Sequence, residues 1–184
     1  QVRLEVARRL DLLDNSVYKM LWVTEFPLFE EDEETGRFIA KHHPFTSPVD
    51  EDLDKLESGD KASLRAKAYD IVINGYEVGG GSVRIFNSDV QKRMFSALGL
   101  SEEEAYEKFG FLLDAFKYGT PPHAGIAFGM DRLIMILAGT NNIKDVIAFP
   151  KNQNAICPMT NAPGLPEEGQ LEELSIKLDV HDEQ

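Results

Sequence analysis

The sequence predicts an α+β fold, mainly an antiparallel sheet flanked by helices. Strand-like runs of aromatic and β-branched residues dominate the middle of the chain, helical patterns gather later, and the two kinds of segment do not alternate regularly. Asn74 and Gly75 separate two such runs, and an Asn-Gly pair accepts the positive φ angles of a tight hairpin turn. These observations favour antiparallel pairing over a doubly wound sheet with a dinucleotide site.

The first third of the chain gives four weaker expectations. Apolar residues at helical spacing predict a helix over about 2–14. Segments 21–29 and 37–45 are typical of two antiparallel strands, joined across an acidic turn around Gly36. The polar stretch 49–66 predicts a loop with one helical turn.

Two helices are predicted after the hairpin, each opened by a capping box. Ser88 stands three residues before Gln91, and Ser101 stands three residues before Glu104. In such a box the two side chains satisfy N–H groups that the first helical turn leaves unpaired. The second helix carries apolar residues on one face, which predicts that this face packs on a core.

The remaining elements complete a single domain with one core. A short apolar strand is predicted over 123–128, and Gly129 precedes an apolar helix. We expect residues 21–160 to form the main domain and 161–184 to be an extension that packs on it.

Composition excludes several classes of protein. The net charge is −13, from 32 acidic and 19 basic residues, which argues against this chain gripping nucleic acid by itself. No apolar run is long enough to cross a membrane and no leader resembles a signal peptide, so we expect a soluble, cytoplasmic protein with no membrane partner. The single cysteine, Cys157, excludes an internal disulfide and is expected to be inert.

The hairpin places two carboxylates on one face. With a two-residue turn, Val72 faces Glu77, and Asp70 lies on the same side of its strand as Val72. Diagonal neighbours of this kind have Cα atoms roughly 7–8 Å apart, so two carboxylates can converge on Mg²⁺ that also holds a polyphosphate. The alternative is a solvated strand face that carries two incidental acids.

Three consecutive glycines follow this pair. Residues 79–81 weaken a strand unless its backbone approaches a ligand closely or bulges. One bulge among these glycines would turn Arg84 onto the face of Asp70 and Glu77, where its guanidinium could bind a carboxylate through two hydrogen bonds.

Other candidate residues are less specific. Arg132 lies in the first turn of its helix, where N-terminal amides favour a phosphate, although an exposed arginine is the more common situation. His42 and His43 lie in a strand context, so their side chains are expected to point to opposite faces and not to share a metal. One of the two could line the pocket formed beside these candidate residues, while the other packs against the protein. His123 is expected to be structural.

Taken together, these motifs resemble bacterial-type aspartyl-tRNA synthetases, in the C-terminal part of their class II catalytic domain. The resemblance covers nearly the whole chain and is carried by His-His-Pro-Phe-Thr-Ser-Pro at 42–48, by 69–84 with Gly-Gly-Gly-Ser, and by 108–113, 125–133 and 145–151. The stretch 125–133 is similar to motif 3 of class II synthetases. The resemblance implies that residues 1–20 are the tail of the family's insertion domain or a connector helix, and that 21–160 are the C-terminal part of the catalytic domain.

The resemblance implies ATP-dependent activation of L-aspartate, followed by transfer to tRNA(Asp), with Mg²⁺ as cofactor. Asp70 and Glu77 resemble the acids that hold the metal, and Arg84 and His42 resemble the residues that bind aspartate. Arg132 resembles the catalytic arginine of motif 3. The residues implied to bind ATP are Glu77, Gly129, Met130, Asp131 and Arg132.

The chain also departs from the family pattern. Motifs 1 and 2 and the anticodon-binding barrel are absent, and Lys144 stands where many relatives have arginine. We therefore expect a fragment that is inactive alone, from a parent enzyme that binds tRNA and forms a homodimer. Whether the parent also charges tRNA(Asn) is left open. Two alternatives remain: a paralogue such as an ammonia-dependent asparagine synthetase, and a non-catalytic fragment that binds a nucleotide or a partner.

Overall fold

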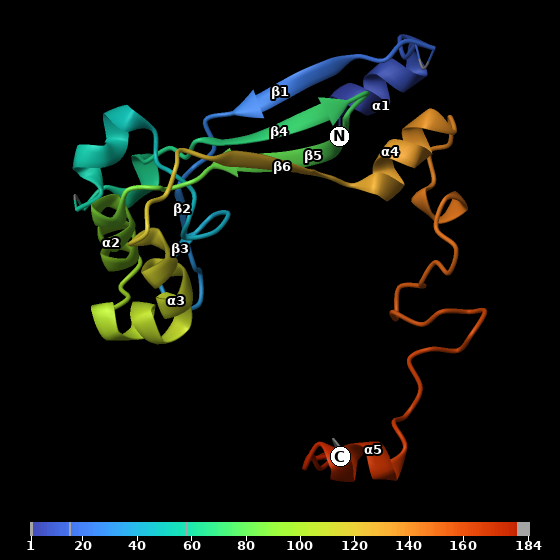
Figure 1. Ribbon diagram of the computed structural model, residues 1–184. Helices are drawn as coiled ribbons and strands as arrows, with labels where there is room; N and C mark the ends of the chain where they lie inside the picture. The colour runs from blue at the N-terminus through green and yellow to red at the C-terminus, as the bar shows by residue number, and fades with distance from the viewer. Residues whose placement is uncertain (1, 15, 58, 180–184) are drawn as a thin grey trace.

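The computed structural model describes residues 2–14, 16–57 and 59–179, and its centre is a four-stranded antiparallel sheet (Figure 1). The strand order is β1-β4-β5-β6. The strands are β1 (Met20–Thr24), β4 (Ala68–Ile73), β5 (Tyr76–Val83) and β6 (Ala124–Phe128). The predicted fold class is confirmed. Within the described residues, no helix is both long and apolar enough to span a bilayer.

The hairpin of β4 and β5 has the predicted turn. Asn74 and Gly75 have φ angles of 49° and 87°, both positive, as a type I′ turn requires. The pairing shifts between Ile71 and Val72, and this shift leaves Val78 of β5 without a partner. The sheet therefore contains a β-bulge immediately before the three glycines.

The predicted pairing of segment 21–29 with 37–45 is only partly correct. A small second sheet joins β2 (Phe29–Glu31) to β3 (Phe38–Ala40) across the acidic turn. The first part of segment 21–29 instead belongs to β1, which pairs with β4. Local pattern could not reveal this, because the choice of partner depends on a strand more than forty residues away in the sequence.

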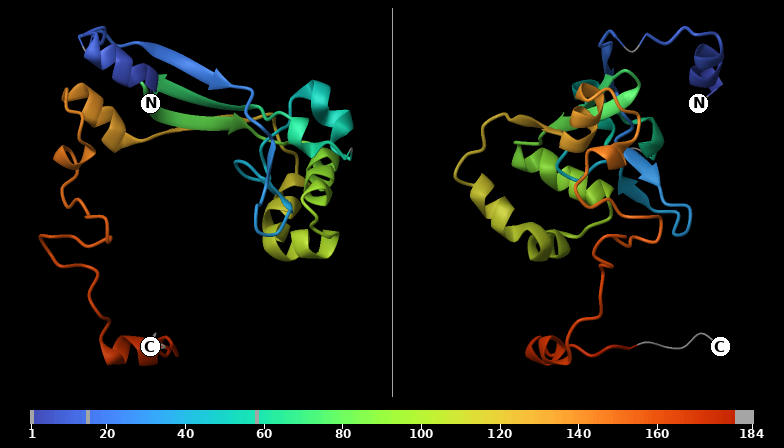
Figure 2. Two further views of the ribbon diagram at one scale, coloured as in Figure 1. Left: turned by 180° about the vertical axis from the view of Figure 1, so that it is seen from behind. Right: turned by 90° about the vertical axis from the view of Figure 1, so that its right-hand side faces the viewer.

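Helices lie beyond the two ends of the main sheet (Figure 2). The α-helices are α1 (Val2–Arg9), α2 (Ser88–Ala97), α3 (Glu102–Phe116), α4 (Met130–Leu137) and α5 (Glu168–Glu173). Three short 3-10 helices complete the list: η1 (Asp50–Lys55), η2 (Lys61–Ser63) and η3 (Ile143–Asp145). The predicted helical turn within 49–66 is thus present as η1 and η2.

One of the two predicted capping boxes is correct. Ser101 caps α3, and its hydroxyl and the Glu104 carboxylate exchange hydrogen bonds with each other's backbone N–H groups. At α2 the cap is Asn87, one residue before the predicted Ser88. Gln91, the expected partner of Ser88, is fully buried and donates from Nε2 to the Pro44 carbonyl at 2.9 Å.

The main core lies at one end of the sheet, beside α2 and η1. Leu56, Leu64 and Met94 are completely buried there, and Phe29 and Ile85 are 2% exposed. Near the C-terminus, α5 stands away from the sheet and contains no buried residue (Figure 1). The domain boundaries, with the packing of segment 161–184, stay predictions.

Candidate functional site

The two predicted acids project from one face of the sheet. Asp70 on β4 pairs with Gly80 on β5, and Val72 pairs with Glu77. Residues that pair directly share a face, as do alternate residues of one strand, so Asp70 and Glu77 lie on the same side. This part of the geometric prediction is confirmed.

The bulge at Val78 brings Arg84 to the same face. Without it, an odd-numbered residue such as Glu77 and the even-numbered Arg84 would point to opposite sides of β5. The prediction placed the bulge among the glycines, whereas the structure has it one residue earlier, at Val78, whose side chain is 1% exposed. Beyond the bulge, every second residue faces the same way, so Gly80, Ser82 and Arg84 lie on the side of the sheet that carries Asp70.

The start of α4 is attached to the bulge. The Gly129 N–H donates to the Val78 carbonyl at 2.8 Å. Nη1 of Arg132 donates to the Glu77 carbonyl at 2.8 Å and lies 3.6 Å from Oε1 of the same residue. The structure therefore brings the predicted motif 3 arginine next to one of the two predicted metal acids. Both side chains are about half exposed and open to a ligand, at 49% for Arg132 and 56% for Glu77.

Arg84 contacts His43. Nη1 of Arg84 lies 3.3 Å from Nδ1 of His43, and because arginine can only donate, the imidazole nitrogen accepts. The hydroxyls of Thr46 and Ser82 also lie within 3.5 Å of the ring. Burial lowers the pKa of His43, and the positive charge of Arg84 lowers it further. Because the imidazole beside it is neutral, the positive charge of Arg84 is not paired with an acidic side chain at this contact.

His42 lies elsewhere. Its ring packs edge-on against Phe26, with 5.1 Å between the ring centroids, and its side chain is exposed. The predicted strand context is wrong, because β3 ends at Ala40 and both histidines lie in the turn that follows. Sequence reasoning singled out His42 and missed the contact of His43. No local pattern signals this contact, because it depends on how the turn after β3 folds back onto β5.

Two pockets differ in their relation to these residues. A pocket of about 340 Å³ opens beside Arg84 and is also lined by His123 and Gly125. A larger pocket of about 700 Å³ lies between α2 and α3, and none of the predicted site residues lines it. We assign the candidate site to the sheet face that carries the predicted acids, together with the smaller pocket at its Arg84 end.

The donor set fits Mg²⁺ bound together with phosphates. Asp70 and Glu77 offer carboxylate oxygens, the hard ligands that Mg²⁺ prefers. Among the described residues, no cluster of three or more His, Cys, Asp or Glu side chains could hold a metal ion. A pair of carboxylates suits Mg²⁺, which typically keeps several waters and takes its other ligands from substrate phosphates.

Comparison with known proteins gives consistent results. A family model described as tRNA synthetases class II (D, K and N) matches residues 3–153. The chain is 62% identical over 178 residues to the aspartate–tRNA ligase of Ruminiclostridium cellulolyticum, covering 97% of this chain and 30% of that protein. It is 63% identical over 177 residues to the aspartate–tRNA(Asp/Asn) ligase of Lachnoclostridium phytofermentans, covering 96% of this chain and 29% of that protein.

The chain thus spans about 30% of the length of these curated relatives. Among solved structures, the aspartyl-tRNA synthetase of Entamoeba histolytica aligns with a TM-score of 0.55 and 20% identity, over 84% of this chain and 26% of that one. This likeness supports the fold. Because the family model covers most of the chain, including the hairpin, the bulge and the start of α4, the chain belongs to the class II tRNA synthetase family of the D, K and N type.

Proposed function

We propose that the full-length protein activates L-aspartate with ATP and transfers the aspartyl group to the 3′ end of tRNA(Asp). The observation that carries the proposal is the single sheet face with Asp70 and Glu77 toward one end and Arg84 toward the other. The names of the relatives at about 60% identity support the same substrates.

The acid end suits ATP. Asp70 and Glu77 would hold Mg²⁺, which neutralises phosphate charge and orients the nucleotide for in-line displacement. The start of α4 supplies Gly129, Met130, Asp131 and Arg132 beside these acids. Arg132 would bind an outer phosphate, since its guanidinium already lies against Glu77 and is about half exposed.

The other end suits the amino acid. Arg84 stands four residues beyond Gly80, which places their Cα atoms about 13 Å apart along the strand. That length can accommodate an aspartate between the metal acids and the arginine. The Arg84 guanidinium would bind the side-chain carboxylate through two hydrogen bonds, with His43 beside it. His42, which is exposed, would close over the bound aspartate.

The remaining partners follow from the same assignment. The transfer step needs tRNA, and the acidic charge of this chain favours an RNA contact supplied mainly by other parts of the protein. We further propose that the full-length protein acts as a homodimer in the cytoplasm, where tRNA is charged.

The test is aspartate-dependent exchange of pyrophosphate into ATP by the full-length protein, with Arg84→Lys as the key variant. Lysine keeps the charge but cannot form two parallel hydrogen bonds to a carboxylate. We expect KM for aspartate to rise about 10- to 100-fold, the value of one charge-assisted hydrogen bond. We expect KM for ATP to change little.

Arg93→Lys is the matched control, because Arg93 lies on α2 and pairs with Glu57 away from the site. This variant should behave like the unmodified protein. An equal loss of aspartate and ATP affinity in Arg84→Lys would contradict the assignment of Arg84. Formation of free asparagine from ammonia, without charging of tRNA(Asp), would replace the proposed function by that of a paralogue.

A further inference from the structure

The side chain of Asp70 lies over a strand position that has no side chain. On this face Asp70 is flanked by Val23 of β1 on one side and by Gly80 of β5 on the other. A Cβ atom on residue 80 would lie 2.3 Å from Oδ1 of Asp70 and 3.3 Å from its Cγ. The Asp70 carboxylate therefore occupies the space that any other residue at position 80 would fill.

Sterics decide where this carboxylate points. Among the described residues, no hydrogen bond or ion pair to the Asp70 carboxylate is present. A branched valine stands on the β1 side and only a hydrogen atom stands on the β5 side. The carboxylate accordingly leans toward β5, the strand that carries Glu77.

The three glycines are not equivalent. A Cβ atom on Gly81 would lie 1.8 Å from the backbone oxygen of Gly125, so the two strands would have to separate. A Cβ atom on Gly79 would lie 2.9 Å from the Ala127 oxygen and from the Phe128 ring, on the opposite face from Asp70. Only at Gly80 is the closest obstruction a rotatable side chain with no backbone atom equally near.

We propose that Gly80 is a positioning residue for the metal site, because its missing side chain directs the Asp70 carboxylate toward Glu77. This inference rests on the proposed function only in taking Asp70 and Glu77 as the acids that hold Mg²⁺. In Gly80→Ala the backbone can stay in place while the carboxylate rotates away from β5. The Asp70 carboxylate would then be turned away from the side on which Glu77 lies.

The experiment measures binding of Mn²⁺, as a probe for Mg²⁺, to the full-length protein with a non-hydrolysable ATP analogue, by electron paramagnetic resonance. Gly80→Ala is expected to weaken Mn²⁺ binding about 10- to 100-fold, the usual effect of changing a residue that orients a metal ligand. Its melting temperature should stay close to that of the unmodified protein. Gly169→Ala, where a Cβ atom would meet nothing within 4 Å, is the matched control.

A second comparison separates positioning from other effects. In an Asp70→Ala background, Gly80→Ala should weaken Mn²⁺ binding no further, because the group that it displaces is gone. A further loss in that background would mean that the added methyl obstructs the ligand directly, and would overturn the proposal. Unchanged Mn²⁺ binding in Gly80→Ala, or a loss of stability as large as that of Gly81→Ala, would also overturn it.

The binding assay needs no aspartate. If the full-length protein fails to activate aspartate but binds Mn²⁺ with the nucleotide in a Gly80-dependent way, the proposed function falls and this inference stands. If aspartate is activated and Gly80→Ala binds Mn²⁺ normally, only this inference falls.

Discussion

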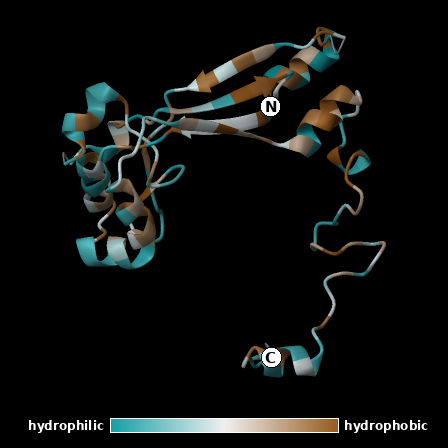
Figure 3. Cartoon of the chain, in the orientation of Figure 1, coloured by the Kyte–Doolittle hydropathy of each residue, from teal (hydrophilic) through white to brown (hydrophobic). Residues whose placement is uncertain are grey.

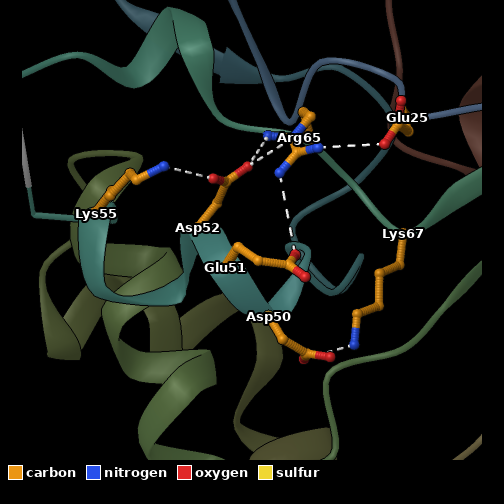
Figure 4. Close-up of polar contacts among 7 residues, drawn as sticks. All are labelled: Glu25, Asp50, Glu51, Asp52, Lys55, Arg65 and Lys67. Atoms are coloured by element: carbon orange, nitrogen blue, oxygen red, sulfur yellow. Dashed lines mark hydrogen bonds and ion pairs between the residues drawn. The ribbon is translucent and has the colours of Figure 1, made fainter.

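Asp52 is the acid most strongly held by its neighbours, and it lies outside the candidate site (Figure 4). Its side chain is 2% exposed, receives an ion pair from Lys55 at 2.8 Å and another from Nε of Arg65 at 3.0 Å, and also accepts from the Arg65 backbone N–H. The hydrogen bond from Lys55 and that from Arg65 lower the pKa of Asp52 to about 2. These contacts fasten η1 to the segment that leads into β4.

Asp52→Asn should therefore destabilise the protein in a pH-dependent way. The pKa of Asp52 is depressed in the folded state, so its contribution is fully present above the unfolded value of 3.8 and is lost as pH falls toward about 2. We expect a cost of roughly 1–2 kcal/mol at pH 7, since the half-exposed partners weaken the pairs. Urea unfolding of variant and unmodified protein, at neutral pH and near pH 2, measures the difference.

Asp50→Asn is the control for this prediction. Asp50 pairs with Lys67, but its side chain is 75% exposed, so its removal should change the free energy of unfolding very little. A difference between Asp52→Asn and unmodified protein that stays constant down to pH 2 would show that charge pairing is not the cause.

At the scale of the elements, most short-range signals predict the structure correctly, whereas the long-range choice of strand partner does not follow from local pattern. The Asn74 and Gly75 turn, the pairing of Val72 with Glu77, and the start of α3 depend on residues a few positions apart, where turn chemistry and capping dominate. The partner of β1 depends on packing between distant segments. The histidine that reaches Arg84 likewise depends on how the turn after β3 folds back, which has no periodic signal.

The corrected cap of α2 gives a test of helix starts. Asn87 and Ser101 each accept backbone N–H groups in a first turn, whereas Ser88 is already the first helical residue. Replacing Asn87 or Ser101 by alanine should cost about 1 kcal/mol, and Ser88→Ala should cost much less. Amide hydrogen exchange in the first turns of α2 and α3 measures this locally. Faster exchange in Ser88→Ala than in Asn87→Ala would instead support the predicted capping box of Ser88 with Gln91.

At the scale of the whole molecule, the chain exposes far more surface than a protein of its length usually does. Its accessible area is 14010 Å², whereas a compact monomer of this size exposes about 8,900 Å². Every residue of β1 and β6 is exposed, and apolar residues lie along β1 and α4 in Figure 3. Exposed apolar faces of this extent mark surfaces that bind other protein segments.

We therefore expect the isolated 184-residue chain to be inactive in adenylate formation and to self-associate. Stabilising a phosphoryl-transfer transition state needs groups on several sides of the reacting phosphate, in a site that excludes water. Here Glu77 and Arg132 are about half exposed on an open sheet face, and β6 beside them is uncovered. Two measurements on the purified chain test this expectation: aspartate-dependent exchange of pyrophosphate into ATP, and light scattering after size-exclusion chromatography. Exchange at a rate near that of the full-length protein, from a monomer, would show that this face alone forms a complete active site.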